Sequence, residues 1–275
     1  MIGEEKEGVC MKNFQLTTYS LRSPKIKPQR EPLRFLFISD LHNVTFGRKN
    51  EVLIRKMKEL RPHAVLVGGD LIVAKPGYSM DPAMELIREM GARFPVYYAL
   101  GNHEYRMRIY PETYGDMYDR YKRVIEESGV VLLDQKKKEI WAEGNKICIC
   151  GFELDRTYYK KGRRKQLPAG ELSAAFGEPQ RDVFTILLAH NPLYGDTYLD
   201  WGADLTLSGH LHGGMIRLGK RAVVSPDFTL FPKYGYGMYR RGDSSLIVSA
   251  GMGEHTIPVR ICNPRELVVV ELWGE

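Results

Sequence analysis

The sequence predicts an α/β fold in which two packed β-sheets carry helices on their outer faces. Between residues 34 and 127, apolar runs of strand length alternate with segments of helical spacing. From Val130 onward, short apolar runs follow one another closely, which is typical of a region built mainly from strands. The chain has 275 residues and is 43% hydrophobic, so it is large enough to build a core of useful size.

The first half of the chain predicts strands and helices in alternation. Continuous or alternating apolar residues indicate strands, whereas apolar residues three and four positions apart indicate one face of a helix. We therefore expect strands at 14–21, 34–39, 64–69 and 95–100. We expect helices at 48–60, from about 81 to 90, and from about 114 to 127.

The second half predicts a series of short strands. They are expected at 130–133, 139–142, 146–152, 183–190, 203–209, 215–218, 222–225, 236–241, 245–251 and 266–272. We expect a single domain over residues 1–275, because the polar motifs described below run from residue 40 to 212 and converge on one site. Residues 1–12 are expected to be loose. The strongly basic segment 156–170 interrupts the strands and is expected to be an inserted loop or cap.

Charge and hydropathy limit the partners and the location. The net charge is +6 and the pI is near 9.0, which favours anionic partners such as phosphorylated metabolites, nucleic acid or acidic lipid surfaces. A solvated basic surface is the alternative. The first thirty residues contain no apolar run of signal-peptide length, and no stretch elsewhere reaches membrane-spanning length. We expect a cytoplasmic protein, with peripheral contact at an acidic membrane as a further option.

Short polar motifs stand where the predicted strands end. They are Asp40-Leu41-His42, Gly69-Asp70, Gly101-Asn102-His103-Glu104, His190 and Gly209-His210-Leu211-His212. Folds of the α/β class expose functional groups at the carboxyl ends of their strands. In the two i, i+2 pairs, an extended backbone would turn both side chains toward one ion. One such motif is weak evidence, but five in one chain indicate a common site.

The residue types in these motifs suit a pair of metal ions. Carboxylates, imidazoles and an amide oxygen without thiolates fit Mn, Fe or Zn, whereas a closed structural zinc site normally uses cysteines. The candidate ligands exceed the needs of one ion: Asp40, His42, Asp70, Asn102, His190, His210 and His212. We therefore expect two divalent metal ions that share a carboxylate, with Mn favoured. Such pairs lie ~3.5–4 Å apart in enzymes that displace groups at phosphorus.

The pattern D-x-H, G-D, G-N-H-[DE], H, G-H-x-H occurs here in full and in order over residues 40–212. In this the chain resembles the calcineurin-like metallophosphoesterase superfamily. The resemblance implies a four-layer α-β-β-α sandwich, in which two mixed sheets are flanked by helices and the metals lie at one edge. It implies one metal on Asp40, His42 and His212, the other on Asn102, His190 and His210, and a bridging Asp70.

The same resemblance implies a chemical role for the residue after Asn102. A water activated by the two metals would attack phosphorus in line, and His103 would be the catalytic acid that protonates the leaving oxygen. Glu104 has two expected roles: it orients that imidazole and keeps it protonated, or it forms a salt bridge within the loop.

Other segments narrow the resemblance to a subgroup. Phosphoprotein phosphatases carry Asp-Arg-Gly after the second motif, whereas this chain reads Asp70-Leu71-Ile72, which argues against that branch. The segments HLHGGMIRL at 210–218 and KYGYGMY at 233–239, together with the tail from Ser249, look like the YkuE/YaeI-type phosphodiesterase-like group. This similarity covers most of the chain from about residue 13.

Further side chains are candidates for substrate contact. Arg106 and Arg108 follow the G-N-H-E motif directly, and one of them is expected to bind the phosphate ester. His255 stands in the glycine-rich segment GMGEHTIPVR, which in the resembling group lies close to the metal edge. The basic segment 156–170 either binds a polyanionic substrate or an acidic membrane, or is a solvated loop.

The leading hypothesis for function is a dinuclear metal-dependent hydrolase of phosphodiester or pyrophosphate bonds. Its substrate would be a phosphate ester such as a nucleotide, a nucleotide-sugar or a lipid head group. One alternative is a nuclease that acts on DNA or RNA, which the basic charge favours. The other is a non-catalytic metal-binding scaffold. Scaffolds in this superfamily usually lack the acid or several ligands, whereas this chain lacks none.

Overall fold

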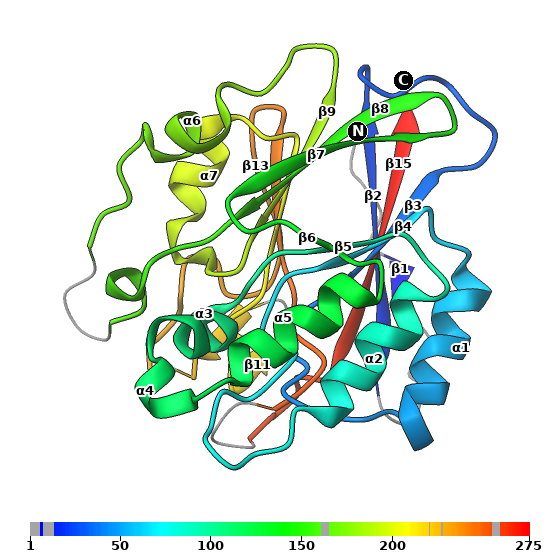
Figure 1. Ribbon diagram of the computed structural model, residues 1–275. Helices are drawn as coiled ribbons and strands as arrows, with labels where there is room; N and C mark the ends of the chain where they lie inside the picture. The colour runs from blue at the N-terminus through cyan, green and yellow to red at the C-terminus, as the bar shows by residue number, and fades with distance from the viewer. Residues whose placement is uncertain (1–5, 8–13, 161–164, 220, 227, 255–258) are drawn as a thin grey trace.

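Two mixed β-sheets with helices against their outer faces make up the structure, which confirms the predicted α/β class (Figure 1). The computed structural model describes residues 6–7, 14–160, 165–219, 221–226, 228–254 and 259–275. Within these ranges, none of the helices combines the length and the apolar character that crossing a bilayer requires.

The first sheet has the strand order β1-β2-β15-β3-β4-β5-β6. Its strands are β1 (Lys6–Glu7), β2 (Gln15–Ser23), β15 (Glu266–Gly274), β3 (Leu33–Ile38), β4 (Ala64–Val67), β5 (Val96–Tyr98) and β6 (Val131–Leu132). Strands β3 to β6 run parallel, while β15 is antiparallel to β3 and parallel to β2. The carboxyl ends of β3, β4 and β5 therefore share one edge.

The second sheet has the order β13-β14-β10-β9-β8-β7. Its strands are β13 (Gly237–Arg241), β14 (Ser244–Val248), β10 (Leu205–Ser208), β9 (Phe184–Ala189), β8 (Asn145–Phe152) and β7 (Lys136–Ala142). The four central strands are parallel and the two outer strands are antiparallel to them. A separate hairpin of β11 (Ile216–Leu218) and β12 (Arg221–Val224) follows β10.

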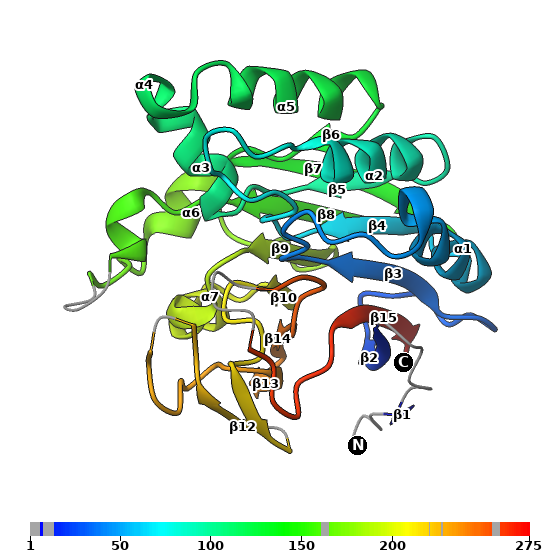
Figure 2. The ribbon, with the colours of Figure 1, turned by 90° about the horizontal axis from the view of Figure 1, so that it is seen from below.

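Helices cover both sheets on their outer faces. The first sheet is covered by α1 (Glu51–Leu60), α2 (Asp81–Gly91) and α5 (Met117–Glu127), and the second by α6 (Glu171–Phe176) and α7 (Gly195–Trp201) (Figures 1 and 2). Between β5 and α5 lie α3 (Asn102–Ile109) and α4 (Pro111–Tyr114). Short 3-10 helices are η1 (Arg48–Asn50), η2 (Arg156–Tyr159) and η3 (Pro192–Tyr194).

Three buried clusters correspond to the interfaces between these layers. On β3, Leu36 and Ile38 pack in the cluster under α1, α2 and α5, whereas Phe35 and Phe37 pack in the cluster between the two sheets. This alternation explains why the strand reads as a continuous apolar run, since both of its faces are buried. A third cluster lies between the second sheet and helices α6 and α7.

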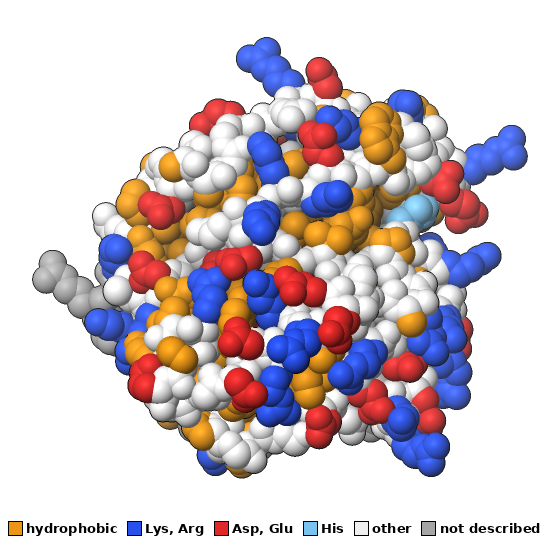
Figure 3. Space-filling model, in the orientation of Figure 1, with side chains coloured by type: hydrophobic (Ala, Val, Ile, Leu, Met, Phe, Trp, Pro, Cys, Tyr) orange, Lys and Arg blue, Asp and Glu red, His pale blue; other side chains and the backbone are white. Residues whose placement is uncertain are grey.

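Two segments of the chain expected to be irregular are described in part. Within 1–12, Lys6–Glu7 pair with β2, and the remaining positions lie outside the described residues. Within 156–170, residues 161–164 lie outside them, while Tyr158 and Leu167 are buried in the third cluster. On the face in Figure 3, Lys and Arg side chains are interspersed with Asp and Glu, so the net positive charge is not gathered into one patch there.

Candidate metal centre

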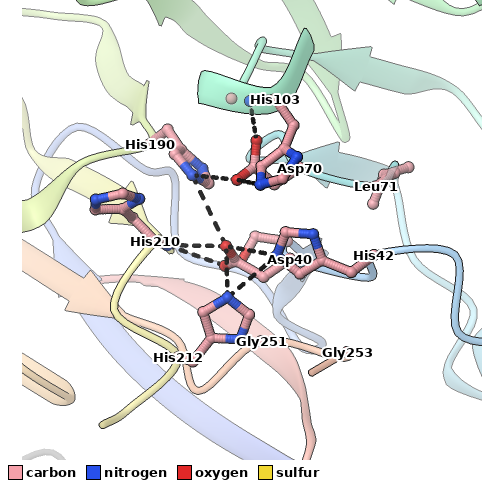
Figure 4. A network of polar contacts seen from close by, with 12 residues as sticks. Asp40, His42, Asp70, Leu71, His103, His190, His210, His212, Gly251 and Gly253 are labelled. Carbon is pink, nitrogen blue, oxygen red and sulfur yellow. Dashed lines mark hydrogen bonds and ion pairs between the residues drawn. The ribbon is translucent and has the colours of Figure 1, made fainter. Parts of the chain in front are cut away.

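The loops after β3, β4, β9 and β10 bring six of the predicted ligands together in two groups (Figure 4). We call Asp40, His42 and His212 the first half-site, and Asp70, His190 and His210 the second half-site. Within each group, the ligand atoms lie within 4.8 Å of one another. Each half-site takes side chains from both sheets, so it exists only where the two sheet edges meet.

The first half-site is built around the carboxylate of Asp40. Its Oδ1 lies 3.5 Å from Nε2 of His212 and 4.0 Å from Nε2 of His42. The two imidazole Nε2 atoms are 3.2 Å apart, and the rings are stacked with an angle of 11° between their planes. All three ligand atoms therefore face one small volume, as a shared cation requires.

The second half-site is contiguous with the first. Nε2 of His190 lies 3.2 Å from Asp70 Oδ2 and 3.7 Å from Asp40 Oδ1. Asp70 also groups with His42 and His103, within the same 4.8 Å limit. Asp70 thus lies between the two half-sites, which is the position that a carboxylate shared by two cations needs.

The backbone at these ligands is not extended, contrary to our expectation for the i, i+2 pairs. A positive φ occurs at Asp40 (51°), His42 (48°), Asp70 (54°), His210 (66°) and His212 (51°). Residues other than glycine pay about 1 kcal/mol or more for this left-handed conformation, which is concentrated at functional sites. The side chains of each pair converge because the chain turns sharply after the strand, and not because an extended strand alternates its faces.

Buried polar atoms test whether this site fits cations. Oδ1 of Asn102 is buried and has no hydrogen-bond partner among the described residues, and an amide oxygen is a suitable ligand for a hard or borderline cation. Asp40 and Asp70 are both buried, and two unneutralised carboxylates in one buried space are costly. The donor set, including the buried amide oxygen of Asn102, therefore fits divalent metal ions.

The pKa values show how strongly this space attracts positive charge. Burial opposes ionisation of His190, but Asp70 and Asp40 outweigh it and raise the pKa of His190 to about 10. Burial also pushes the pKa of Asp70 upward, yet His190 and His103 hold it well below its usual range. By contrast, burial raises the pKa of Asp40, and repulsion from Asp70 adds to this.

Glu104 supports the loop that carries Asp70. Its buried carboxylate accepts hydrogen bonds from the backbone N–H groups of Asp70 (2.9 Å), Leu71 (3.1 Å) and Gly101 (3.1 Å), and from the hydroxyl of Tyr98 (2.8 Å). The bond to Gly101 is half of a capping box at the start of α3. These contacts hold backbone, whereas we had expected contact with the imidazole of His103 or a salt bridge.

His103 lies beside Asp70, with its Nε2 3.9 Å from Asp70 Oδ2. Its Nδ1 accepts a hydrogen bond from the N–H of Ala74 (2.8 Å) and lies 3.1 Å from Nη2 of Arg106. Burial, together with the positive charge of Arg106 and other neighbours, lowers the pKa of His103 to about 3 despite the attraction of Asp70. The neutral ring thus carries its proton on Nε2, the nitrogen that faces the half-sites.

The structure separates the two arginines of the expected substrate pair. Arg106 is next to His103, whereas Arg108 is bound to Asp134 (2.8 Å) and Glu153 (2.7 Å). Those carboxylates follow β6 and β8, so Arg108 ties α3 to both sheets. His255, the third expected substrate residue, lies outside the described residues.

Other residues near the site were missed from the sequence. The ring of Tyr159, in η2, lies 5.2 Å from the ring of His210, edge to face. Nη2 of Arg260 lies 3.3 Å from Nδ1 of His212. The N–H of Gly253 donates to the carbonyl of Asp40 (2.6 Å). The glycine pair at 251 and 253 was a sequence signal for close backbone approach. Tyr159 and Arg260 lie in the segments 156–170 and 251–260, which the sequence marked for contact with substrate or the metal edge, but neither side chain was singled out as part of the site.

Comparisons with known proteins identify the family and the relatives of this chain. The model of the calcineurin-like phosphoesterase family matches residues 33–214. The uncharacterised protein YpbG of Bacillus subtilis is 27% identical over 268 residues, which cover 94% of this chain and 86% of that protein. The uncharacterised metallophosphoesterase YkuE of the same organism is 25% identical over 267 residues, covering 94% and 85%.

Solved structures share the fold at low identity. The sulfate thiohydrolase SoxB of Thermus thermophilus superposes with a TM-score of 0.52 and 13% identity, covering 83% of this chain and 53% of that one. A 5'-nucleotidase from Staphylococcus aureus, described as putative, gives a TM-score of 0.50 and 14% identity, covering 80% and 49%. This chain spans about half the length of each, and the likeness shows the fold alone.

Proposed function

Because the chain belongs to the calcineurin-like phosphoesterases, we propose that it is a two-metal hydrolase of phosphodiester or pyrophosphate bonds. The observation that carries the proposal is the pair of contiguous Asp/His half-sites, with Asp70 between them. A scaffold that binds no metal would have no need for this many buried ligands around unneutralised carboxylates, since each adds to the cost of folding; a metal-binding scaffold is separated from an enzyme by the turnover test below.

The residues divide into ligands and groups that act on the substrate. Asp40, His42 and His212 would hold one cation, and Asn102, His190 and His210 the other, with Asp70 shared. When bound, such cations lower the pKa of water to near neutrality and offset the charge that develops on the phosphoryl oxygens. Mn²⁺ is the favoured metal, with Fe or Zn as alternatives, because the donors are oxygen and imidazole nitrogen.

His103 acts on the leaving oxygen in this proposal. Its Nδ1 is engaged by the Ala74 N–H, so the proton on Nε2 points toward the side of Asp70, where the phosphate ester would lie. A hydrogen bond from Nε2 stabilises the leaving oxygen as the bond to phosphorus breaks. Arg106, adjacent to His103, supplies a cation for a non-bridging oxygen of the ester.

The direct test is hydrolysis of bis-p-nitrophenyl phosphate by the metal-free chain after addition of Mn²⁺. We expect turnover well above the metal-only blank. His103→Ala should keep the bound metal but lower kcat about 10²-fold or more, because the group that acts on the leaving oxygen is lost. The matched control is His63→Ala, which removes a histidine whose ring accepts from the Arg34 N–H, remote from the half-sites.

Three results would contradict the proposal or part of it. A chain that binds two equivalents of Mn²⁺ without turnover on diesters, nucleotides, nucleotide-sugars or phospholipid head groups would be a scaffold. Turnover by His103→Ala equal to that of the His63→Ala control would remove His103 from the mechanism. If only DNA or RNA were cleaved, with a steep dependence on salt, the nuclease alternative would replace the leading one.

A further inference from the structure

The hairpin of β11 and β12 lies outside the two main sheets and is widened by a chain segment on each side. On one side, Ile261 pairs with Ile216 of β11. On the other side, Leu230 pairs with Val224 of β12. Within the hairpin, Ile216 stands opposite Val224. Cross-strand partners point to the same face of a sheet, so these four apolar side chains form one row. In Figure 2, β12 lies at the margin of the molecule.

Arg217 shows which face of the hairpin points inward. It is buried, and its Cζ lies 3.8 Å from the centroid of the Tyr236 ring. Its cross-strand partner, Ala222, is also buried. Successive side chains of a strand point to opposite faces. Ile216 and Leu218, on either side of Arg217, therefore point outward.

The outward face of the hairpin is apolar and open to solvent. Leu218 is 67% exposed, Leu230 65% and Ile261 50%. An antiparallel sheet with one solvated face normally turns its polar side chains outward, and this hairpin does the reverse. Apolar side chains that are exposed side by side mark a surface that binds a partner.

The charge of this face indicates the kind of partner. Arg221 is exposed and is the cross-strand partner of Leu218, so it shares the outward face. Acidic residues are absent from the described parts of the hairpin and its flanking segments, which are 216–219, 221–226, 228–231 and 259–262. Apolar side chains together with a cation suit an acidic lipid bilayer. A second copy packed on the same face would bring two Arg221 side chains to one apolar interface, which like charges oppose.

This face adjoins the metal centre. β11 begins four positions after His212. Arg260 immediately precedes Ile261, and its Nη2 lies 3.3 Å from Nδ1 of His212. The chain therefore passes directly from the first half-site into the hairpin, and the flanking segment contacts the same half-site.

We propose that the hairpin docks the chain on the surface of an acidic lipid bilayer. We call its outward side chains the docking face: Ile216, Leu218, Arg221, Val224, Leu230 and Ile261. The apolar members enter the boundary between head groups and acyl chains, and Arg221 attracts acidic head groups. Docking itself requires neither metal nor turnover. Its consequence, that hydrolysis takes place at a membrane surface, rests on the proposed function.

The test is co-sedimentation of the full chain with phosphatidylcholine vesicles that either contain or lack phosphatidylglycerol. We expect binding to the vesicles that contain phosphatidylglycerol. The double variant Leu218→Ser/Leu230→Ser should lower this affinity about tenfold or more, because two apolar side chains no longer leave water. Arg221→Ala should lower it about fivefold and leave binding to the neutral vesicles unchanged.

Trp141→Ser is the matched control. Trp141 is 71% exposed, so it is at least as accessible as the two leucines. It pairs with Lys146 near the start of β8, at the end of the second sheet away from the metal centre. This variant should bind vesicles as the wild type does.

Three results would overturn the docking face. They are no binding to the acidic vesicles, equal binding by the double variant and the control at unchanged melting temperature, and a dimer in light scattering that the double variant separates. If the double variant fails to fold, the comparison of Arg221→Ala with the control decides. The double variant should hydrolyse soluble bis-p-nitrophenyl phosphate at the wild-type rate. Vesicle binding without hydrolysis would overturn only the proposed function, whereas hydrolysis without vesicle binding would overturn only the docking face.

Discussion

The two half-sites use the same kinds of ligand but are supported in different ways. Around the second half-site, Glu104 holds the Asp70 loop through backbone N–H groups, and Arg108 ties α3 to both sheets. Around the first half-site, the support comes from a glycine-containing loop and from Arg260. The difference shows that ligand identity alone does not determine a metal site. The hydrogen bonds around each ligand also set its orientation and its basicity.

The largest expected effect comes from the residue that the half-sites share. Asp70→Asn keeps the side-chain volume but removes the charge between the half-sites, so each proposed cation would lose part of the negative charge that holds it. We expect kcat/KM for bis-p-nitrophenyl phosphate to fall about 10³-fold, since several kcal/mol of charge stabilisation depend on the metal pair. Activity within tenfold of wild type would show that Asp70 is not shared.

Gly251→Ala tests the first half-site through its backbone. Gly251 has φ +69°, and an added Cβ would lie 2.8 Å from Cβ of Asp40. We expect a loss of about 2–4 kcal/mol of unfolding free energy in urea, from the clash and the left-handed backbone together. The matched control is Gly77→Ala, with φ +79° and no atom within 4 Å of the added Cβ, which should lose only about 1 kcal/mol. Equal losses would contradict the close packing at Asp40.

Glu104→Gln tests the support of the second half-site. The amide NH₂ of glutamine would face backbone N–H groups that now donate to a carboxylate. We expect a loss of about 1–3 kcal/mol of unfolding free energy, because buried donors lose their acceptor. Glu254→Gln is the control, since the side chain of Glu254 is partly exposed and pairs with Arg265; it should lose less than about 1 kcal/mol. A Glu104→Gln variant as stable as this control would refute the supporting role.

The smallest effect concerns the pH dependence of stability that Glu153 causes. Glu153 accepts a hydrogen bond from Arg108 of α3. Burial, together with the neighbouring Asp134, raises the pKa of Glu153 from 4.5 to about 8, although Arg108 opposes the shift. A carboxyl whose folded pKa is raised stabilises the fold below its unfolded pKa, and that stability is lost as pH rises through the folded pKa. The unfolding free energy should therefore fall between about pH 4.5 and 8, by on the order of 1–2 kcal/mol more in wild type than in Glu153→Gln. Parallel pH profiles for the two proteins would contradict this.

Much of the fold was predictable because its strands are buried on both faces. Strands such as β3 and β4 read as unbroken apolar runs, and α1, α2 and α5 are long enough to show helical spacing. The helices α3, α4, α6 and α7 were missed. They have only 8, 4, 6 and 7 residues, so little periodicity is available. Glu104, three residues after Gly101, was a signal for the start of α3, since its side chain accepts from the Gly101 N–H.

That six candidate ligands lie together was predictable from the sequence, whereas the residues that support them were not. The candidate ligands follow strands whose carboxyl ends share an edge. The left-handed backbone at Asp40 and His212 results from tertiary packing, which a local pattern does not encode. Arg260 lies 48 positions beyond His212 in the chain, and Arg108 finds its carboxylates 26 and 45 positions away. Contacts at such separations follow from the fold and have no periodic signature.

The most direct test of a two-metal hydrolase is to follow Mn²⁺ binding and hydrolysis of bis-p-nitrophenyl phosphate in one titration of the metal-free chain. The account predicts two equivalents bound per chain, with little turnover at the first equivalent and a steep rise as the second binds. Full turnover at one equivalent, or none at two, would contradict it.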